Sequence, residues 1–458
     1  MISNNPWNLE QLKSELERRK EVNSWVITQE HVHRRERYFM LDCDSLVVDQ
    51  DRDVQVENIS LKLATPLSKS GRQGEITKKL FQALPLSAQI DSAIQAARET
   101  DHQEWQLPLT VPKDIPHRAT ADPAMSEDLE SVVNELTQEI RSVVLQKRPT
   151  RFNSAELFLS THRREVHLSN GLVHRGTQTR VYAESAFSRS DMRDGKLHSD
   201  EYLNTRWAVN RADLKIGELF DETSDRAAHM LDVSRPKTGR YPVIVDSEVL
   251  LGLLNGHMSQ LSGANSYHGL PFVKPGDDLI PGASGDLLTI TLDPSLEYGA
   301  DTTAVSEQGL IQSPLRLVEK NKVIQTATDK QFADYLGTKA TTTCGNVVVD
   351  PGKSTHEQLT KSALAVVEIL QFSAIVADPN SGTFSSEIRL AKHYDNRTGR
   401  VTYLKGGSLS GSIKENFKGL RLSNDQVKRA TFSANASRGQ GYFGPSFALL
   451  SDVSIVGD

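Results

Sequence analysis

Two histidines mark the stretch LLGLLNGHMSQLSGANSYHG, which spans Leu250–Gly269 and follows the strand-like run YPVIVD at 241–246. Leucines recur at helical spacing on both sides of His257, so it lies on an apolar helix, while His268 lies just beyond the helix. Imidazole is a common metal ligand, and this helix could therefore carry part of a metal-dependent site. A lone histidine on an apolar face is more often a packed core residue, and residue type alone favours that alternative.

A second group of candidate ligands lies in REVHLSNGLVHRG, residues 164–176. The Asn170-Gly171 pair is a strong signal for a two-residue hairpin turn. With that turn, His167 would face His174 and Glu165 would share their side of the sheet, with opposed Cβ atoms about 5 Å apart. Two imidazoles and a carboxylate could bind a divalent ion. The same pattern also fits the solvated face of a half-buried hairpin, which is the simpler explanation.

The pair His356-Glu357 is the third candidate. A metallopeptidase helix needs two imidazoles to hold the metal and a carboxylate to accept a proton from bound water. In STHEQLTKSAL, no second histidine follows at either helical spacing. Ser354 and Glu357 have the S-x-x-E spacing of a capping box ahead of an apolar stripe, and this explains the pair without a metal.

Other common catalytic motifs are missing from the sequence. There is no phosphate-binding G-x-x-x-x-G-K-[ST] loop and no G-x-S-x-G nucleophile elbow. Cys43 and Cys344 are the only cysteines, which excludes a zinc site built mainly of thiolates. Neither cysteine has a histidine close in sequence, although pairing in space stays open.

Composition narrows the class of protein further. The chain has 458 residues, 37% hydrophobic and 24% charged, which suggests two or three folded domains. A net charge of −6 argues against a dedicated nucleic-acid binder. No apolar run approaches the roughly 18 residues of a membrane span, and MISNNPWNLEQLK does not resemble a secretory signal. Sparse cysteine fits a reducing compartment, so we expect a cytoplasmic protein, with one disulfide left open.

The helices and strands that must position these candidates are distributed unevenly, with more predicted helices in the first half and mainly predicted strands in the second. Apolar stripes predict helices around 9–16 and 90–97, and a longer helix from about Glu127 to Gln146 with Ser126 as its N-cap. Strand-like runs at 287–292, 386–394, 400–404 and 447–456 dominate the second half, where the spacing also predicts one long helix from Thr355 to Phe372.

The overall pattern predicts an α+β protein. We expect an α/β N-terminal domain over residues 1–236 and a β-rich, antiparallel or barrel-like C-terminal domain with a few helices over residues 237–458. The segment SRPKTGRYPV, residues 234–243, is the expected boundary.

Three segments together resemble the TldD/PmbA family, also called modulators of DNA gyrase. They are FNSAELFLS with EVHLSNGLV, then TGRYPVIVDSEVLLGLLNGH, and then DPNSGTFSSEIRLAKHYDNRTGRVTYLKGGSLSGSIKENF. Their order and spacing extend the resemblance over nearly the whole chain. The resemblance implies the domain layout expected above. The family has two branches that work as a pair, and the resemblance implies that the chain belongs to one of them. The TldD branch carries H-E-x-x-x-H and a metal-binding cysteine near the C-terminus.

The motif of the catalytic branch is degenerate here. The final Gly-His of that motif matches Gly256-His257, which puts Gly252 at the first histidine and Leu253 at the glutamate. ANASRGQG, residues 434–441, matches the cysteine segment loosely and contains no cysteine. One imidazole cannot hold zinc well, and no base remains. The chain therefore resembles the TldE (PmbA) branch, with no metal or cofactor of its own.

The resemblance implies a non-catalytic subunit of a cytosolic heterodimeric zinc metallopeptidase. A TldD-like H-E-x-x-x-H partner would supply zinc and catalysis, and unfolded peptides would be the substrate, gripped at a sheet edge that we expect in the C-terminal half. One alternative is a self-associating ligand- or peptide-binding protein without a peptidase role. Another is an enzyme with a relocated site at Glu165, His167 and His174. We expect neither nucleic acid nor membrane as a partner.

Overall fold

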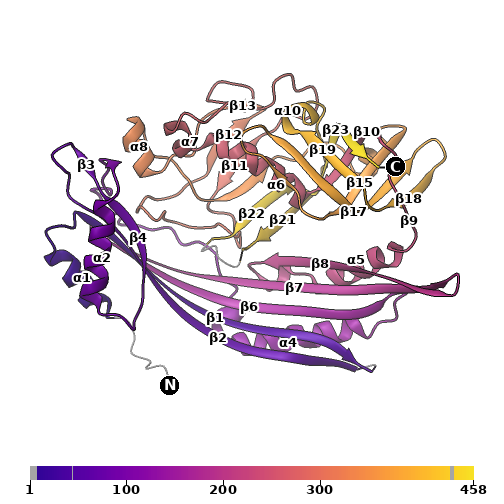
Figure 1. Cartoon of the computed structure of the whole chain (residues 1–458), viewed down its shortest axis with the longest axis horizontal. Coiled ribbons are helices and arrows are strands. Elements are labelled where there is room, and N and C mark those ends of the chain that lie inside the picture. Colours follow the sequence, from indigo (N-terminus) through magenta and orange to yellow (C-terminus); the bar gives the residue numbers. More distant parts are fainter. Residues whose placement is uncertain (1–7, 44, 434–437, 458) are drawn as a thin grey trace.

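The computed structural model describes residues 8–43, 45–433 and 438–457. Long, curved strands from the N-terminal half form one large layer, and the C-terminal half sits above its concave side (Figure 1). The elements of the first half are α1 (Leu9–Arg18), β1 (Ser24–Asp42), β2 (Ser45–Ala64), β3 (Arg72–Gln73), β4 (Glu75–Leu80), α2 (Leu86–Arg98), β5 (His102–Gln103), α3 (Pro123–Glu127), α4 (Leu129–Val144), β6 (Arg151–Leu168), β7 (Val173–Arg193), β8 (Lys196–Ala208), η1 (Arg211–Asp213), α5 (Ile216–His229) and β9 (Val233–Ser234).

The second half is richer in short strands. Its elements are β10 (Gly239–Asp246), α6 (Ser247–Met258), η2 (Ser259–Leu261), α7 (Gly263–Tyr267), β11 (Ile290–Asp293), β12 (Leu315–Glu319), β13 (Lys322–Val323), α8 (Lys330–Leu336), β14 (Asn346–Val349), α9 (His356–Thr360), β15 (Ala365–Phe372), β16 (Val376–Ala377), β17 (Thr383–Asp395), β18 (Arg400–Leu404), β19 (Ser408–Ser412), α10 (Ile413–Asn416), β20 (Arg421–Leu422), β21 (Gln426–Thr431), β22 (Gln440–Pro445) and β23 (Phe447–Val456).

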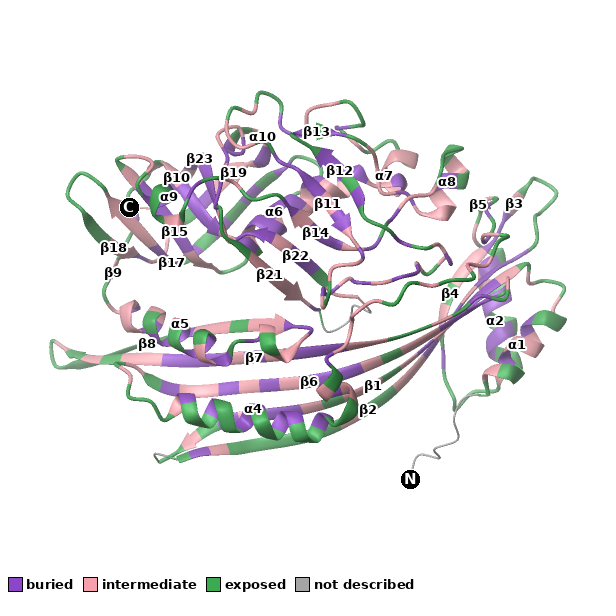
Figure 2. Ribbon diagram, turned by 180° about the vertical axis from the view of Figure 1, so that it is seen from behind, coloured by how far each residue is buried: buried purple, intermediate pink, exposed green. Residues whose placement is uncertain are grey.

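The curved sheet follows the order β4-β2-β1-β6-β7-β8 and continues through β21 and β22 into the C-terminal half. Side chains alternate between its two faces. On one face, odd-numbered residues of β6 such as Leu157 and Leu159 pack against the apolar stripe of α4, while Ile27 of β1 packs against α1 and α2. Figure 2 shows the buried stripe of α4 turned toward the strands. Even-numbered residues of β1 and β6 therefore point toward the C-terminal half.

The second sheet follows the order β15-β10-β23-β19-β17-β18-β9, and an extra pairing of β15 with β17 closes five of its strands into a small barrel. The predicted α+β class with a barrel-like C-terminal half is confirmed. The expected boundary at residues 236–237 falls between β9 and β10 and stays a prediction. β9 already pairs with β18 of the second half.

Two predicted helices differ from the observed ones. The helix expected from Glu127 to Gln146 is divided, because α3 ends at Glu127 and Asp128, not Ser126, caps α4 by accepting the N–H of Ser131. The helix expected from Thr355 to Phe372 is wrong: α9 ends at Thr360 and the remainder forms β15. Val367 and Ile369 are buried in the barrel core, and Val366 is buried on the other face against Leu359 of α9. Periodicity alone does not separate such a short buried strand from a buried helix.

The helices of the described ranges are all short or polar. None is long and apolar enough to cross a membrane.

Candidate functional site

Helix α6 carries the degenerate motif and begins at a well-formed cap. The carboxylate of Asp246 accepts the backbone N–H groups of Glu248 and Val249, at 3.1 and 2.9 Å. The strand-to-helix junction is therefore fixed by the last residue of β10. Four leucines of the helix, Leu250, Leu251, Leu253 and Leu254, are buried in the core of the C-terminal half.

The three motif positions on α6 lie in different surroundings. Gly252 lines a cavity of about 390 Å³ between α6, β8 and β15, and a Cβ there would meet no atom within 4 Å. Leu253 is 1% exposed and belongs to the apolar core. His257 does not line the cavity beside Gly252. The helix therefore does not direct these three positions toward one common point.

His257 is a packed core residue. It is 1% exposed, and neither ring nitrogen has a hydrogen-bond partner among the described residues. Its ring contacts Phe272 edge-on at 5.2 Å between centroids, and the Lys414 ammonium lies 3.9 Å from the centre of the Phe272 ring. Burial, followed by repulsion from Lys414, lowers the pKa of His257 to about 4. The imidazole is therefore neutral at pH 7. His268 lies exposed after α7, beside Tyr267 and Phe332, and does not complete a pair with it.

The hairpin candidates do not share a face of the sheet, so that prediction was wrong. β6 ends at Leu168 and β7 begins at Val173, which makes the loop four residues long instead of two. In the resulting register His167 is opposite Val173, and His174 is opposite Val166. A one-residue shift sends a side chain to the other face, so His167 and His174 point to opposite sides.

Glu165 and His167 remain neighbours on one side of the hairpin. The His167 Nε2 lies 2.5 Å from Glu165 Oε1, and Arg175 also holds the Glu165 carboxylate, at 2.7 Å. The hydrogen bond from Arg175 lowers the pKa of Glu165, and burial lowers the pKa of His167. Glu165 and Arg175 therefore form a structural ion pair beside a buried imidazole.

The His356-Glu357 pair also has structural partners. His356 Nε2 lies 3.0 Å from Oε1 of buried Glu368, and Glu357 pairs with Lys361 at the surface. The predicted capping box is shifted by one residue: Thr355 and Gln358 form it, in place of Ser354 and Glu357.

A zinc centre needs three or more ligating side chains gathered at one point. In the part of the chain that the structure describes, no group of three histidine, cysteine, aspartate or glutamate side chains is placed to hold a metal ion. Cys43 and Cys344 are both free thiols. In the segment matched to the family's cysteine region, residues 434–437 lie outside the described residues.

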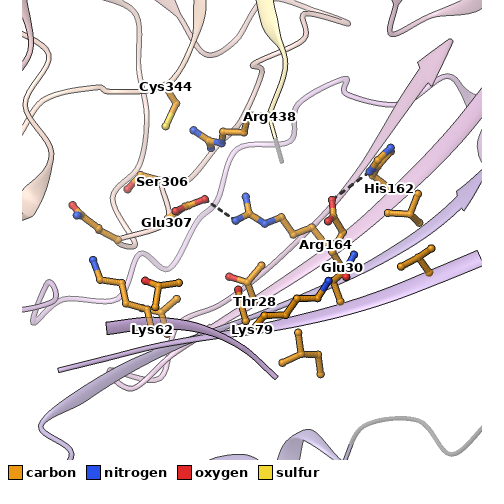
Figure 3. A pocket seen from close by; sticks show the side chains of 18 of the residues that line it. Thr28, Glu30, Lys62, Lys79, His162, Arg164, Ser306, Glu307, Cys344 and Arg438 are labelled. Carbon is orange, nitrogen blue, oxygen red and sulfur yellow. Dashed lines mark hydrogen bonds and ion pairs between the residues drawn. The ribbon is translucent and has the colours of Figure 1, made fainter. Parts of the chain in front are cut away.

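A cavity with a polar lining lies in a place that the sequence did not reveal. It has a volume of about 850 Å³ and lies between the even-numbered face of the curved sheet and loops of the C-terminal half. Figure 3 shows Arg164 and His162 reaching into it from the sheet, with Arg438, Cys344 and Glu307 opposite. Polar residues at alternate positions of β1, such as Thr28, Glu30 and Arg34, were the sequence signal for a polar face of the sheet. Only the pairing of distant strands shows that this face encloses a cavity.

Ion pairs arrange the side chains of this cavity. Arg164 Nη2 lies 2.7 Å from Glu307 Oε1, and His162 Nδ1 lies 3.3 Å from Glu30 Oε1. The hydrogen bond from His162 lowers the pKa of Glu30, so this carboxylate is ionised at pH 7. Burial raises the pKa of the Cys344 thiol, which keeps it protonated.

Comparison with known proteins identifies the C-terminal half most clearly. Residues 238–457 match the family model described as the PmbA/TldA metallopeptidase C-terminal domain. No curated protein sequence matches the chain.

Solved structures share the whole fold at low sequence identity. A candidate modulator of DNA gyrase from Bacteroides thetaiotaomicron superposes with a TM-score of 0.75 and 16% identity over 98% of both chains. TldE from Thermococcus kodakarensis gives a TM-score of 0.75 and 14% identity, over 98% of this chain and 99% of the other. A candidate modulator of DNA gyrase from Thermotoga maritima gives 0.71 and 16%, with 98% and 99% covered. At these identities the likeness shows the fold.

Proposed function

We propose that this chain is a non-catalytic, TldE-like subunit of a heterodimeric zinc metallopeptidase, because its residues 238–457 match the C-terminal domain of the PmbA/TldA metallopeptidases. A homologue with H-E-x-x-x-H would hold the zinc and cut unfolded peptides in the cytoplasm. This chain would complete the enclosure around the substrate.

The observation that carries the proposal is the environment of α6. The motif needs an imidazole at position 252 and a carboxylate at position 253, and the chain has Gly252 and a buried Leu253 there. A carboxylate that activates a metal-bound water must reach the metal site. Position 253 instead faces an apolar core, where a charge would be strongly disfavoured. The helix is therefore adapted to packing.

Reconstitution tests this division of labour. Cleavage of an unfolded peptide is measured with this chain alone, with the H-E-x-x-x-H homologue alone, and with both together. We expect cleavage to require the homologue, and to be greatest in the mixture. Light scattering on the same samples is expected to show a one-to-one complex.

Matched variants assign the catalysis to one subunit. His257→Leu in this chain is expected to leave cleavage by the mixture unchanged, whereas replacing a motif histidine of the homologue abolishes it. Peptide cleavage by this chain alone would contradict the proposal. A chain that forms only homodimers in the presence of the homologue would favour a self-associating binding protein instead.

A further inference from the structure

The 850 Å³ cavity described above is separate from the degenerate motif. Gly252, Leu253 and His257 do not line it. Its walls come from β1, β2, β4, β6 and β7 of the curved sheet and from loops around Ser306, Cys344 and Arg438 in the C-terminal half. Any role of this space is therefore additional to the fate of the metal motif on α6.

The lining of the cavity is basic, in contrast to the acidic chain. Three acidic side chains line it, Glu30, Glu307 and Asp329, and twice as many basic ones. The basic residues are Arg34, Lys62, Lys79, Arg164, Arg180 and Arg438. The lining alone has a formal excess of three positive charges, whereas the whole chain carries −6. Carboxylates outside the lining, Glu36, Glu75 and Asp301, pair with Arg34, Lys62 and Arg438. The guanidinium groups that reach the cavity, rather than its net charge, therefore offer an anion its contacts.

We propose that this cavity binds the carboxylate of an extended peptide, held by Arg164, Arg180 and Arg438. These guanidinium groups come from β6, β7 and the segment before β22, so they converge from separate parts of the fold. Figure 3 shows Arg438 entering from the C-terminal half and Arg164 from the sheet. Guanidinium groups match carboxylates geometrically and form strong charge-assisted hydrogen bonds with them.

Arg180 has the least exposed side chain of the three. Its residue is 7% exposed, its guanidinium carbon lies 4.5 Å from the centre of the Phe432 ring, and its Nε donates to Gln178 Oε1 at 3.1 Å. Burial lowers the pKa of Arg180 to about 10, against the attraction of Glu30. The side chain is thus held in place before any ligand enters, and a carboxylate would meet a charge that is only weakly hydrated.

The neighbouring sheet edge indicates that the ligand is a peptide. Val54, Val56 and Asn58 of β2 line the cavity, and β4 covers β2 only from Ile59 to Ala64. Before Ile59, the outer edge of β2 pairs with no other strand within the described ranges. An extended chain can add to such an edge through backbone hydrogen bonds. This open edge lies in the N-terminal half, whereas the sequence led us to expect it in the C-terminal half.

The acidic residues of the cavity favour a monoanion. Arg164 is already held by Glu307, and Glu30 lies beside His162 in the same space. Glu30 and Glu307 would repel a phosphate ligand, which carries two negative charges, more strongly than a carboxylate ligand, which carries one. The inference rests on the proposed function only in taking a peptide as the ligand, since the charge and shape of the cavity belong to this chain alone.

The test compares fluorescent peptides of one sequence without aspartate or glutamate, ending in a free carboxylate or an amide. Binding to the full chain is measured by anisotropy, with inorganic phosphate as a competitor. We expect the free carboxylate to bind at least about tenfold more tightly, which is the effect of one strong charge-assisted contact. A third, amidated peptide with one internal glutamate distinguishes a terminal carboxylate from a side-chain carboxylate.

Variants place the effect in the cavity. Arg180→Met and Arg438→Met are each expected to remove the preference for the carboxylate. Arg151→Met, which removes an exposed charge at the far end of β6, is expected to keep it. Thermal unfolding of each variant verifies that it is folded.

The inference is overturned if the unmodified chain binds the carboxylate and amide peptides equally tightly. It is also overturned if both cavity variants keep the preference for the carboxylate. The third contradicting result is that inorganic phosphate displaces the bound peptide at concentrations below those of the peptide. These results would leave the heterodimer proposal standing, because reconstitution tests it separately. If the chain prefers the free carboxylate but does not assemble with the homologue, the cavity inference stands and the heterodimer proposal fails.

Discussion

At the scale of single residues, identity and surroundings together decide what a motif position can do. His257 keeps the residue type of a metal ligand, but its ring nitrogens are buried without a hydrogen-bond partner among the described residues. Gly252 lacks a side chain and faces open space, and Leu253 fills part of the core. Sequence alignment with the motif identified all three positions. It could not show their separate directions, which depend on how α6 packs.

Gly252→Ala is expected to stabilise the protein. Gly252 lies inside α6 and a Cβ has free space there, so alanine gains helix propensity without a clash. The expected increase in the free energy of unfolding is about 0.5–1 kcal/mol, measured by urea denaturation. Gly256→Ala is the matched control, because its Cβ would lie 3.1 Å from both the Cβ and the carbonyl oxygen of Ala377. A loss of stability in Gly252→Ala itself would contradict the open site.

His257→Leu is expected to change how stability depends on pH. The pKa of His257 is lowered from 6.5 to about 4 by burial, so the unfolded chain binds a proton more readily than the folded one. This group therefore costs no stability above pH 6.5 and destabilises progressively as the pH falls toward 4, by at most about 3 kcal/mol. Denaturation from pH 7 to 4 is expected to show a shallower loss in His257→Leu. Parallel curves for both proteins would refute the buried neutral imidazole.

At the scale of elements, local sequence patterns correctly predicted those helices and strands whose conformation depends on neighbouring residues in the sequence. The stripes of α1, α2 and α4 are buried as their spacing indicated, and β17, β18 and β23 match predicted strands. The patterns failed where distant partners decide. β15 is a strand because the barrel closes through it, and the β6–β7 register differs by one residue from the two-residue turn. That single step separates His167 from His174.

The capping box at α9 gives an element-scale prediction. Thr355→Ala removes the hydroxyl that accepts the Gln358 N–H, and we expect a loss of about 1 kcal/mol in the free energy of unfolding. Glu357→Ala removes only a surface pair with Lys361, so a change below about 0.5 kcal/mol is expected. Urea denaturation of both variants compares them. A larger loss in Glu357→Ala would restore the cap assigned from sequence.

At the scale of the whole molecule, the two halves are joined more closely than their separate patterns suggested. Strands β21 and β22 of the C-terminal half extend the N-terminal sheet through the pairing of Ala430 with Trp207. The concave face of that sheet and the facing loops enclose the basic cavity. Neither feature is visible in local sequence, because each depends on residues far apart in the chain, such as Ala430 and Trp207 in the sheet and Arg164 and Glu307, 143 positions apart, in the cavity.

The zinc content of the purified chain, alone and in complex with its H-E-x-x-x-H homologue, tests the central claim most directly. We expect only substoichiometric zinc in this chain, and about one zinc per heterodimer that is retained in a His257→Leu complex. Mass spectrometry of metals in both samples gives the answer. Equimolar zinc in the chain alone, lost on His257→Leu or on His167→Ala, would contradict the account.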